Sequence, residues 1–252
     1  MKISQVQKIT LSAFFLALTI ILTRITPLQN IPVIPWIRIS LGPALIIFSS
    51  LLLGPIYGAI VGALSDILGI VLFPNALGYG INPLFTLVYG LLGILPWMLF
   101  WIVKKIKKPQ ISGICMTSVG ILIFATATYL IFFNPIILEN YEFELWLKII
   151  IISLIFVLFV GTIIAIFFID KYFKNKYSSN HNTFNIAFVC FISELLLMLL
   201  LNSLVKTINF EVNFWIIFFA QAIVFFVDVP LNTFVVEGLL FLVSKSKIVA
   251  SK

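Results

Sequence analysis

The sequence predicts an all-α membrane protein that crosses the bilayer about eight times. Of its 252 residues, 62% are hydrophobic and 10% are charged, whereas soluble domains are about half apolar and a quarter charged. The apolar stretches approach or exceed the roughly 20 residues that a membrane helix needs. A β-barrel is excluded because its strands would alternate apolar and polar positions.

Eight apolar stretches account for these crossings. We place the helices at residues 8–27, 38–53, 55–74, 81–103, 111–133, 146–169, 183–205 and 213–244. The pair Gly54-Pro55 separates the second helix from the third, because proline interrupts a helix but suits its first turn. The last stretch is longer than a perpendicular span, which predicts a helix that is tilted, broken or begins outside the bilayer. The first stretch resembles a signal peptide, but we expect it to be retained because no cleavage site precedes Arg24.

The distribution of basic residues predicts the orientation. With an even number of spans, twelve lysines fall on the side that holds both termini. Four basic residues, Arg24, Arg38, Lys148 and Lys206, fall on the other side. Because lysine and arginine accumulate in cytoplasmic loops, both termini are predicted to be cytoplasmic. This distribution accounts for the net charge of +7 without nucleic-acid binding.

The third predicted helix carries small residues along one face. Gly54, Gly58, Gly62 and Asp66 recur every four residues, which places them on one side of a helix. Small residues let another helix approach closely, so these four residues are assigned to helix packing. The carboxylate of Asp66 is costly in lipid and must face protein or water.

Two arginines and two aromatic residues are candidates for substrate binding at the outer side. Arg24 and Arg38 flank the proline-rich loop TPLQNIPVIPW. They either extend to the membrane interface or bind an anion, since guanidinium groups bind carboxylates at two points. Trp36 and Tyr79 either belong to an aromatic belt or stack on a flat heterocycle.

Four further polar residues are predicted to contact a substrate. These are Asn82, Thr86, Asn202 and Gln221. Asn202 and Gln221 belong to the last two helices, which also contain Glu194 and Asp228. Charged residues inside a membrane segment form either a polar cavity or contacts that fix helix packing, and both interpretations remain open here.

Enzymatic chemistry is not predicted. The sequence has no GxxxxGK[ST] phosphate loop, no HExxH motif and a single histidine, His181, in a polar loop. Cys115 and Cys190 lie in apolar segments without metal-site or disulfide spacing. We therefore expect no metal, no cofactor and no catalytic site.

Several segments resemble the substrate-binding (S) components of energy-coupling factor (ECF) vitamin transporters, closest to the folate-type branch. They are AFFLA, RISLGPALIIFSSLLLGPIYGAIVGALSDILGIVLFP and YGINPLFTLVYGLLG, with SELLLMLLLNSLVK and DVPLNTFVVEGLLFLV near the C-terminus. The resemblance implies one transmembrane domain over residues 1–252, built on a six-helix bundle. Residues 8–105 would form the first four helices and residues 183–245 the last two. Residues 108–180 would be an inserted helix pair and a cytoplasmic loop.

One position departs from the folate pattern. Asn82-Pro83-Leu84 stands where the family often has Pro-Gly before Phe-Thr-Leu.

The resemblance implies capture of a vitamin, folate or a related pterin, at a bacterial plasma membrane. A separate transmembrane coupling protein and two ABC ATPases would supply the energy. Ala13 and Ala17 match the small-residue motif that contacts the coupling protein in this family. Two alternatives remain open: an S component for another small nutrient, and a membrane scaffold subunit without transport function.

Overall fold

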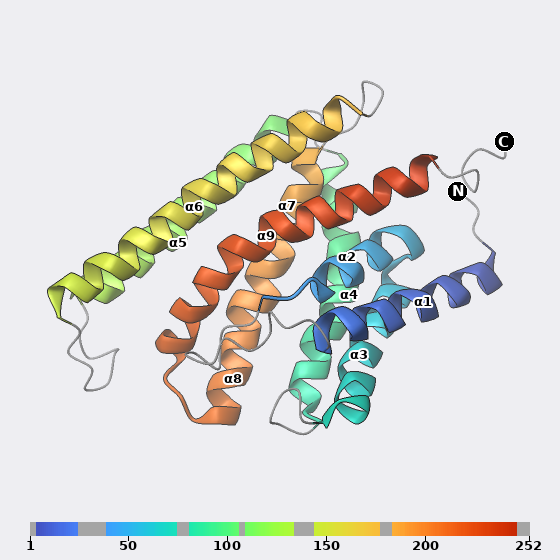
Figure 1. Cartoon of the computed structure of the whole chain (residues 1–252), viewed down its shortest axis with the longest axis horizontal. Coiled ribbons are helices and arrows are strands. Elements are labelled where there is room, and N and C mark those ends of the chain that lie inside the picture. The colour runs from blue at the N-terminus through green and yellow to red at the C-terminus, as the bar shows by residue number, and fades with distance from the viewer. Residues whose placement is uncertain are drawn as a thin grey trace.

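The computed structural model describes residues 4–24, 39–74, 81–105, 109–133, 144–176 and 183–245, and its regular elements there are all helices (Figure 1). The helices are α1 (Gln5–Arg24), α2 (Gly42–Leu53), α3 (Pro55–Leu72), α4 (Pro83–Val103), α5 (Pro109–Phe133), α6 (Leu145–Lys174), α7 (Thr183–Glu194), η4 (Leu195–Leu201), α8 (Asn202–Phe210) and α9 (Phe214–Lys245). Helix η4 is a π-helix, and α7, η4 and α8 form one continuous rod over Thr183–Phe210. The all-helical prediction is confirmed.

Within the described residues, seven helices are long and apolar enough to cross a membrane, and α2 is the shorter eighth. We predicted that the second helix begins at residue 38, but α2 begins at Gly42 and has 12 residues. A helix of that length extends about 18 Å, less than the roughly 30 Å hydrocarbon core. Ten of its residues are buried, so protein rather than lipid surrounds α2.

Helix α9 is longer than a perpendicular span. It has 32 residues and continues through Pro230, which corresponds to about 48 Å of helix. Of the alternatives that the sequence left open for this stretch, a broken helix is therefore excluded. The helix runs obliquely across the molecule (Figure 1).

A central bundle surrounds α2. This helix packs against α1, α3, α4 and α9, while the rod α7–α8 packs against α4 and α9. Its core includes Phe15 of α1 and Phe48 of α2, whose rings meet edge to face with centroids 5.1 Å apart. The bundle therefore joins the first four helices to the C-terminal ones.

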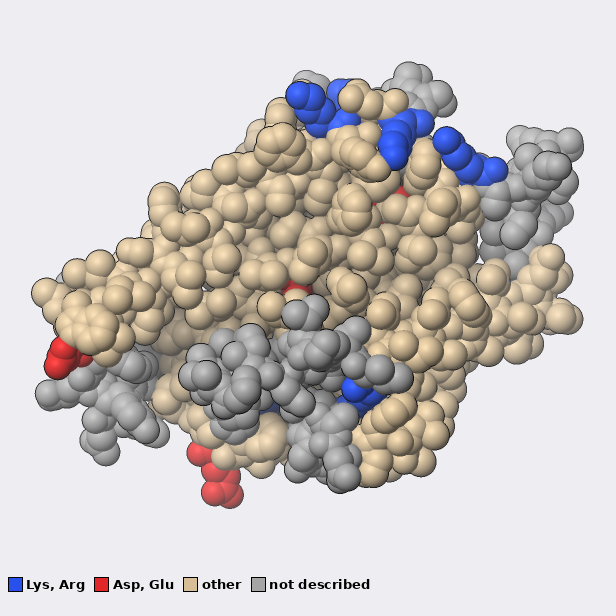
Figure 2. Space-filling model, viewed as in Figure 1, with Lys and Arg blue, Asp and Glu red and all other residues tan. Residues whose placement is uncertain are grey.

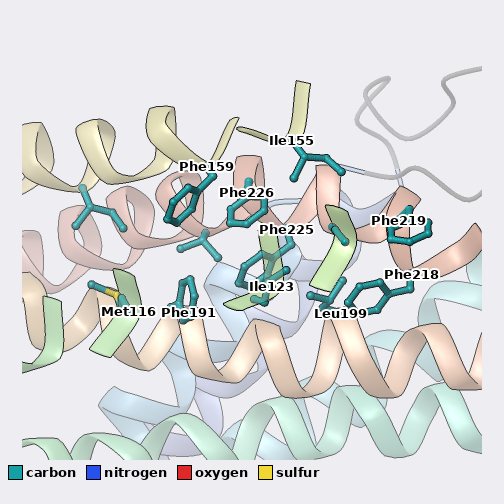
Figure 3. Packing of buried hydrophobic residues seen from close by; sticks show 14 of the residues in the cluster. Met116, Ile123, Ile155, Phe159, Phe191, Leu199, Phe218, Phe219, Phe225 and Phe226 are labelled. Atoms are coloured by element: carbon teal, nitrogen blue, oxygen red, sulfur yellow. The ribbon is translucent and has the colours of Figure 1, made fainter. Parts of the chain in front are cut away.

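Helices α5 and α6 form a long hairpin on one side of this bundle (Figure 1). They pack mainly on each other, on α7 and on α9. Figure 3 shows the cluster of buried side chains that joins them to the bundle. Phe159 of α6 meets Phe226 of α9 with ring centroids 5.6 Å apart. This peripheral position is compatible with an inserted helix pair, which remains a prediction.

The charged residues are separated along the molecule. Figure 2 shows most of the visible lysines and arginines along the upper edge of this face, the lysine-rich end, and acidic residues projecting from the lower edge, while further basic and acidic atoms are visible between them. Helix α1 begins and α9 ends toward the lysine-rich end (Figure 1). The arrangement is the one that a cytoplasmic location of both termini requires, although that location itself stays a prediction.

Candidate functional site

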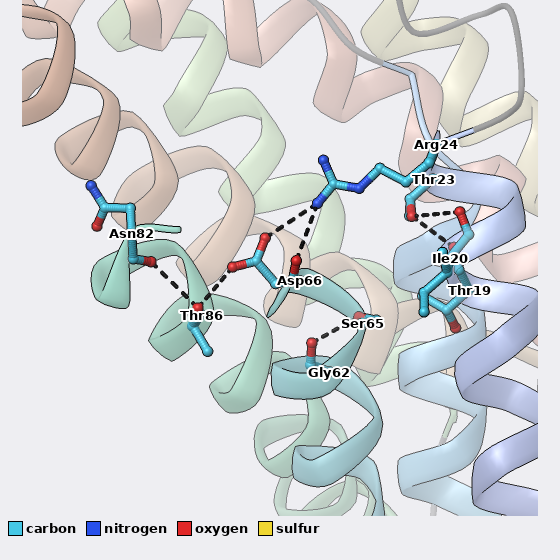
Figure 4. A network of polar contacts seen from close by, with 9 residues as sticks. All are labelled: Thr19, Ile20, Thr23, Arg24, Gly62, Ser65, Asp66, Asn82 and Thr86. Atoms are coloured by element: carbon cyan, nitrogen blue, oxygen red, sulfur yellow. Dashed lines mark hydrogen bonds and ion pairs between the residues drawn. The ribbon is translucent and has the colours of Figure 1, made fainter. Parts of the chain in front are cut away.

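A polar network joins α1, α3 and α4 (Figure 4). Arg24, the last residue of α1, places Nη2 3.5 Å from both the Oδ1 and the backbone oxygen of Asp66 in α3. The hydroxyl of Thr86 in α4 donates to the other carboxylate oxygen of Asp66 at 2.8 Å. The two charged side chains are almost fully buried, with 5% of Arg24 and 2% of Asp66 exposed.

The guanidinium of Arg24 fits because Gly69 leaves room for it. A Cβ at position 69 would lie 2.6 Å from Arg24 Nε. Nε and Nη1 are buried and have no hydrogen-bond acceptor in the described part of the chain. An arginine carries five N–H donors, and buried donors are nearly always satisfied. Two nitrogens of Arg24 are therefore suited to hold an anionic group that the structure does not contain.

Asn82 extends the network to α8. Its side-chain oxygen caps α4 by accepting from the backbone N–H of Leu84 at 2.9 Å. Its side-chain nitrogen donates to the amide oxygen of Asn209. Thr86 also lies 3.4 Å from the backbone oxygen of Asn82. The structure thus brings together three residues predicted from the sequence to contact a substrate, Arg24, Asn82 and Thr86.

A second polar group lies where the rod α7–α8 meets α9. Asn232 donates to Oε1 of Glu194 at 2.8 Å, and both residues are fully buried. Asp228, one turn before Asn232, is close enough to Glu194 for electrostatic interaction and makes a hydrogen-bonding contact with the backbone of Ser40. Oδ1 of Asp228 and Oδ1 of Asn232 have no partner among the described residues. The amide oxygen of Asn232 can only accept a hydrogen bond, whereas the oxygen of Asp228 accepts one when its carboxyl group is ionised.

The backbone changes form beside this group. The π-helix η4 follows directly after Glu194. Single π-turns inside α-helices are rare and occur frequently at functional sites. The change of helix type therefore coincides with the buried carboxylate.

The remaining predicted substrate residues have different positions. Asn202 is half-buried at the start of α8, and Gln221 is buried in α9. Arg38, Trp36 and Tyr79 lie outside the described residues.

Sequence reasoning missed Asn209 and assigned Asp66 to helix packing alone. Asn209 follows Asn202 by seven residues, a spacing that puts both on one face of a helix. That periodicity was a usable signal. Nothing in the sequence indicated that Asp66 would meet Arg24, 42 residues away.

A comparison with known families now identifies the kind of protein. The family model described as the ECF-type riboflavin transporter, S component, matches residues 3–174. That range includes α1 to α6 and most of the chain. The chain belongs to this family. It is therefore a multi-pass membrane protein related to transporter subunits, which are not a class of enzyme.

One curated relative of this ECF S component is the folate transporter FolT of Clostridium novyi (strain NT). The two are 33% identical over 110 residues, which is 44% of this chain and 57% of the relative. The chain thus aligns with little more than half of that protein. No solved structure matches the chain.

The glycines of the S component separate into two kinds. A Cβ at Gly58 would lie 2.3 Å from the backbone oxygen of Gly93, and one at Gly62 would lie 2.0 Å from that of Tyr89. These two glycines let α3 and α4 touch at their backbones. Gly54 does not share that contact: its φ is +103° and a Cβ would meet nothing within 4 Å. Its role is to adopt the extended, positive-φ backbone between α2 and α3, which glycine adopts most readily.

Ala13 and Ala17 lie on the exposed face of α1. The opposite face buries Ser12, Phe15 and Thr19 against the bundle. The two alanines are therefore not used for packing within the described chain. A helix of another protein has room to approach this face.

Proposed function

We propose that this S component captures a vitamin at the outer side of the membrane and delivers it to a complex of one coupling protein and two ABC ATPases. The main support is the family match over residues 3–174. The absence of a phosphate-loop motif from the sequence agrees with energy supplied by other subunits.

We propose folate or a related pterin as the substrate. The buried guanidinium of Arg24, with donors free on Nε and Nη1, carries this choice. The glutamate tail of folate carries carboxylates, whereas riboflavin carries none. A charge-assisted, two-point hydrogen bond to a carboxylate is the strongest contact that an arginine makes. The relative named as a folate transporter supports the same choice.

The acceptors of the second polar group support a pterin ring as well. One edge of a pterin presents an amino group and a ring N–H, which are adjacent donors. Oδ1 of Asp228 and Oδ1 of Asn232 are buried acceptors without partners in the described residues. The corresponding edge of the flavin ring presents two carbonyl acceptors around one N–H. The amide oxygen of Asn232 can only accept, so a flavin carbonyl placed against it would leave two acceptors facing each other, which is costly.

Equilibrium binding to the purified chain tests the proposal. Folate is expected to bind in preference to riboflavin, thiamin, biotin and pantothenate. Arg24→Ala is expected to weaken folate binding by about 1.5–3 kcal/mol, the range for hydrogen bonds to charged groups, or roughly ten- to more than a hundredfold. Arg38→Ala is expected to act in the same direction if its side chain also holds the tail.

A pterin without the glutamate tail, such as 6-methylpterin, provides the matched control. Its affinity should not depend on Arg24, because it has no carboxylate for the guanidinium to bind. Riboflavin is the second candidate substrate because the matching family model carries its name. Tight binding of riboflavin without folate binding would overturn the choice of folate. Failure to bind any vitamin, or uptake into liposomes without an ATPase, would overturn the proposed function.

A further inference from the structure

An apolar crevice separates the α5–α6 hairpin from the central bundle near the lysine-rich end. It has a volume of about 280 Å³ and is lined by α5, α6, α7 and α9. Its lining includes Gly113 and Thr117 of α5, Phe159 and Thr162 of α6, Phe184 of α7 and Phe226 of α9. Gln110 and Phe184 lie within the first two residues of their helices as the structure describes them, so the crevice extends close to the helix ends.

Polar contacts join the surrounding helices and leave few polar atoms facing the crevice. The hydroxyl of Thr162 donates to the backbone oxygen of Phe226, which joins α6 to α9. Ser112 donates to Asn185 at 2.9 Å, and both side chains are buried between α5 and α7. Thr117 donates to the backbone oxygen of Ile114 in its own helix. Apolar atoms therefore form nearly all of the crevice surface, which excludes a polar molecule such as a vitamin from it.

The charges beside the crevice indicate what kind of apolar molecule occupies it. The crevice wall on α6 ends at Ile166, and the same helix continues to Lys171 and Lys174, with Lys176 just beyond it. Asp170 is the one carboxylate in this stretch of sequence. Lys174 follows Ile163 by eleven residues, which aligns them on one face about 16 Å apart. Long lysine side chains extend toward the membrane surface and attract anionic lipids there.

We propose that this crevice binds one acyl chain of an anionic phospholipid, whose phosphate contacts the lysines at the end of α6. The helices that form the crevice are among those long and apolar enough to span the membrane, so lipid chains are the surrounding solvent. The crevice and the lysines together match the two chemical parts of such a lipid. The proposal is independent of the vitamin and of the residues around Arg24.

Native mass spectrometry of the full chain tests this proposal, after exchange into nanodiscs of phosphatidylglycerol and phosphatidylcholine and mild detergent extraction. Wild type is expected to retain one phosphatidylglycerol. Thr117→Trp fills the crevice and should lower that occupancy at least tenfold. Thr126→Trp makes the same change on an exposed part of α5 and should retain the lipid. Gly113→Leu fills the crevice from a second position, so a folding defect in one variant does not decide the result.

The lysines are tested separately. Replacing Lys171, Lys174 and Lys176 by Gln should leave a lipid bound but reduce the preference for phosphatidylglycerol by about fivefold for each lysine at low salt. Equal occupancy in wild type, Thr117→Trp and Gly113→Leu would overturn the proposal. So would an unchanged preference in the triple variant. A photoreactive residue at position 117 that attaches to another polypeptide instead of lipid would also overturn it.

Discussion

At the scale of single residues, the guanidinium of Arg24 has two competing partners: the carboxylate of Asp66 and the anionic group of the proposed substrate. A buried ion pair stabilises a fold only when each charge keeps a partner. Asp66 has two, Arg24 and Thr86, whereas Arg24 reaches Asp66 through one nitrogen. The contact at 3.5 Å is long for a charge-assisted bond. The carboxylate therefore positions Arg24 while leaving the guanidinium able to bind another anion.

We expect Asp66→Ala to destabilise the protein more than Thr86→Val. The first change leaves the buried guanidinium without a counter-charge and should lower the free energy of unfolding by about 3–5 kcal/mol. The second removes one hydrogen bond to a charged group, at a cost of about 1.5–3 kcal/mol. Unfolding in detergent with increasing denaturant measures both. Equal, small losses would mean that water already solvates this network.

The backbone contact at Gly62 predicts a second effect at this scale. A methyl group there would meet the Tyr89 backbone oxygen at 2.0 Å, so α3 and α4 must separate. Gly62→Ala should lower the free energy of unfolding by about 1–3 kcal/mol, as overpacking does. Gly161→Ala in α6 is the matched control, because a Cβ there meets nothing within 4 Å. That change should be neutral or stabilising, since alanine favours helices by up to about 1 kcal/mol, and a similar loss in both variants would contradict the packing argument.

At the scale of elements, α1 presents one face to the bundle and the other outward. Ala13→Trp with Ala17→Trp adds bulk on the outward face. Because small residues allow helices to approach in a membrane, this double variant should abolish copurification with the coupling protein and ATPases while leaving vitamin affinity unchanged. Ile150→Trp with Leu154→Trp makes a matched change on the exposed face of α6 and should not affect assembly. If the variant loses vitamin affinity as much as it loses the coupling protein, Ala13 and Ala17 pack within this chain rather than against a partner.

The elements were largely predictable from the sequence, since local signals mark their ends. Pro55, Pro83 and Pro109 each stand at the first position of a helix, where proline is favoured. The short, buried α2 was not predictable, because hydropathy does not distinguish a helix surrounded by protein from one surrounded by lipid. The network of Arg24 and Asp66 was not predictable either. It depends on how α1 and α3 pack, which local patterns do not specify.

At the scale of the whole molecule, the separation of charges predicts the orientation. Lys245 lies at the end of α9, and Glu211 follows α8. In a chain with Cys115 and Cys190 replaced by Ala, Glu211→Cys should react with an impermeant maleimide added to intact cells. Lys245→Cys should react only after the cells are permeabilised, because lysine-rich ends remain cytoplasmic. The reverse pattern would invert the predicted topology.

The α5–α6 hairpin is either an insertion beside the vitamin-binding core or a part of that core. The two alternatives predict different results when the hairpin is deleted. The family match extends through the hairpin to residue 174, whereas the packing places α1 to α4 directly against the rod α7–α8 and α9. If the pair is an insertion, removing residues 109–174 and joining α4 to α7 by a short linker should preserve vitamin binding. The linker is feasible because α4 ends and α7 begins at the same end of the molecule (Figure 1).

This deletion exposes the Phe159-facing side of α9 to lipid, which is tolerable because lipid is as apolar as the lost partner. Thermal stability should fall, since the ring contact between Phe159 and Phe226 disappears. Removing α8 and α9 instead should abolish binding, because Asn209, Asp228 and Asn232 are lost. Equilibrium binding of the vitamin to each deletion variant in nanodiscs measures these two effects. If the hairpin deletion folds, as judged by a monodisperse elution profile, yet binds no vitamin, α5 and α6 belong to the binding core and the insertion hypothesis is wrong.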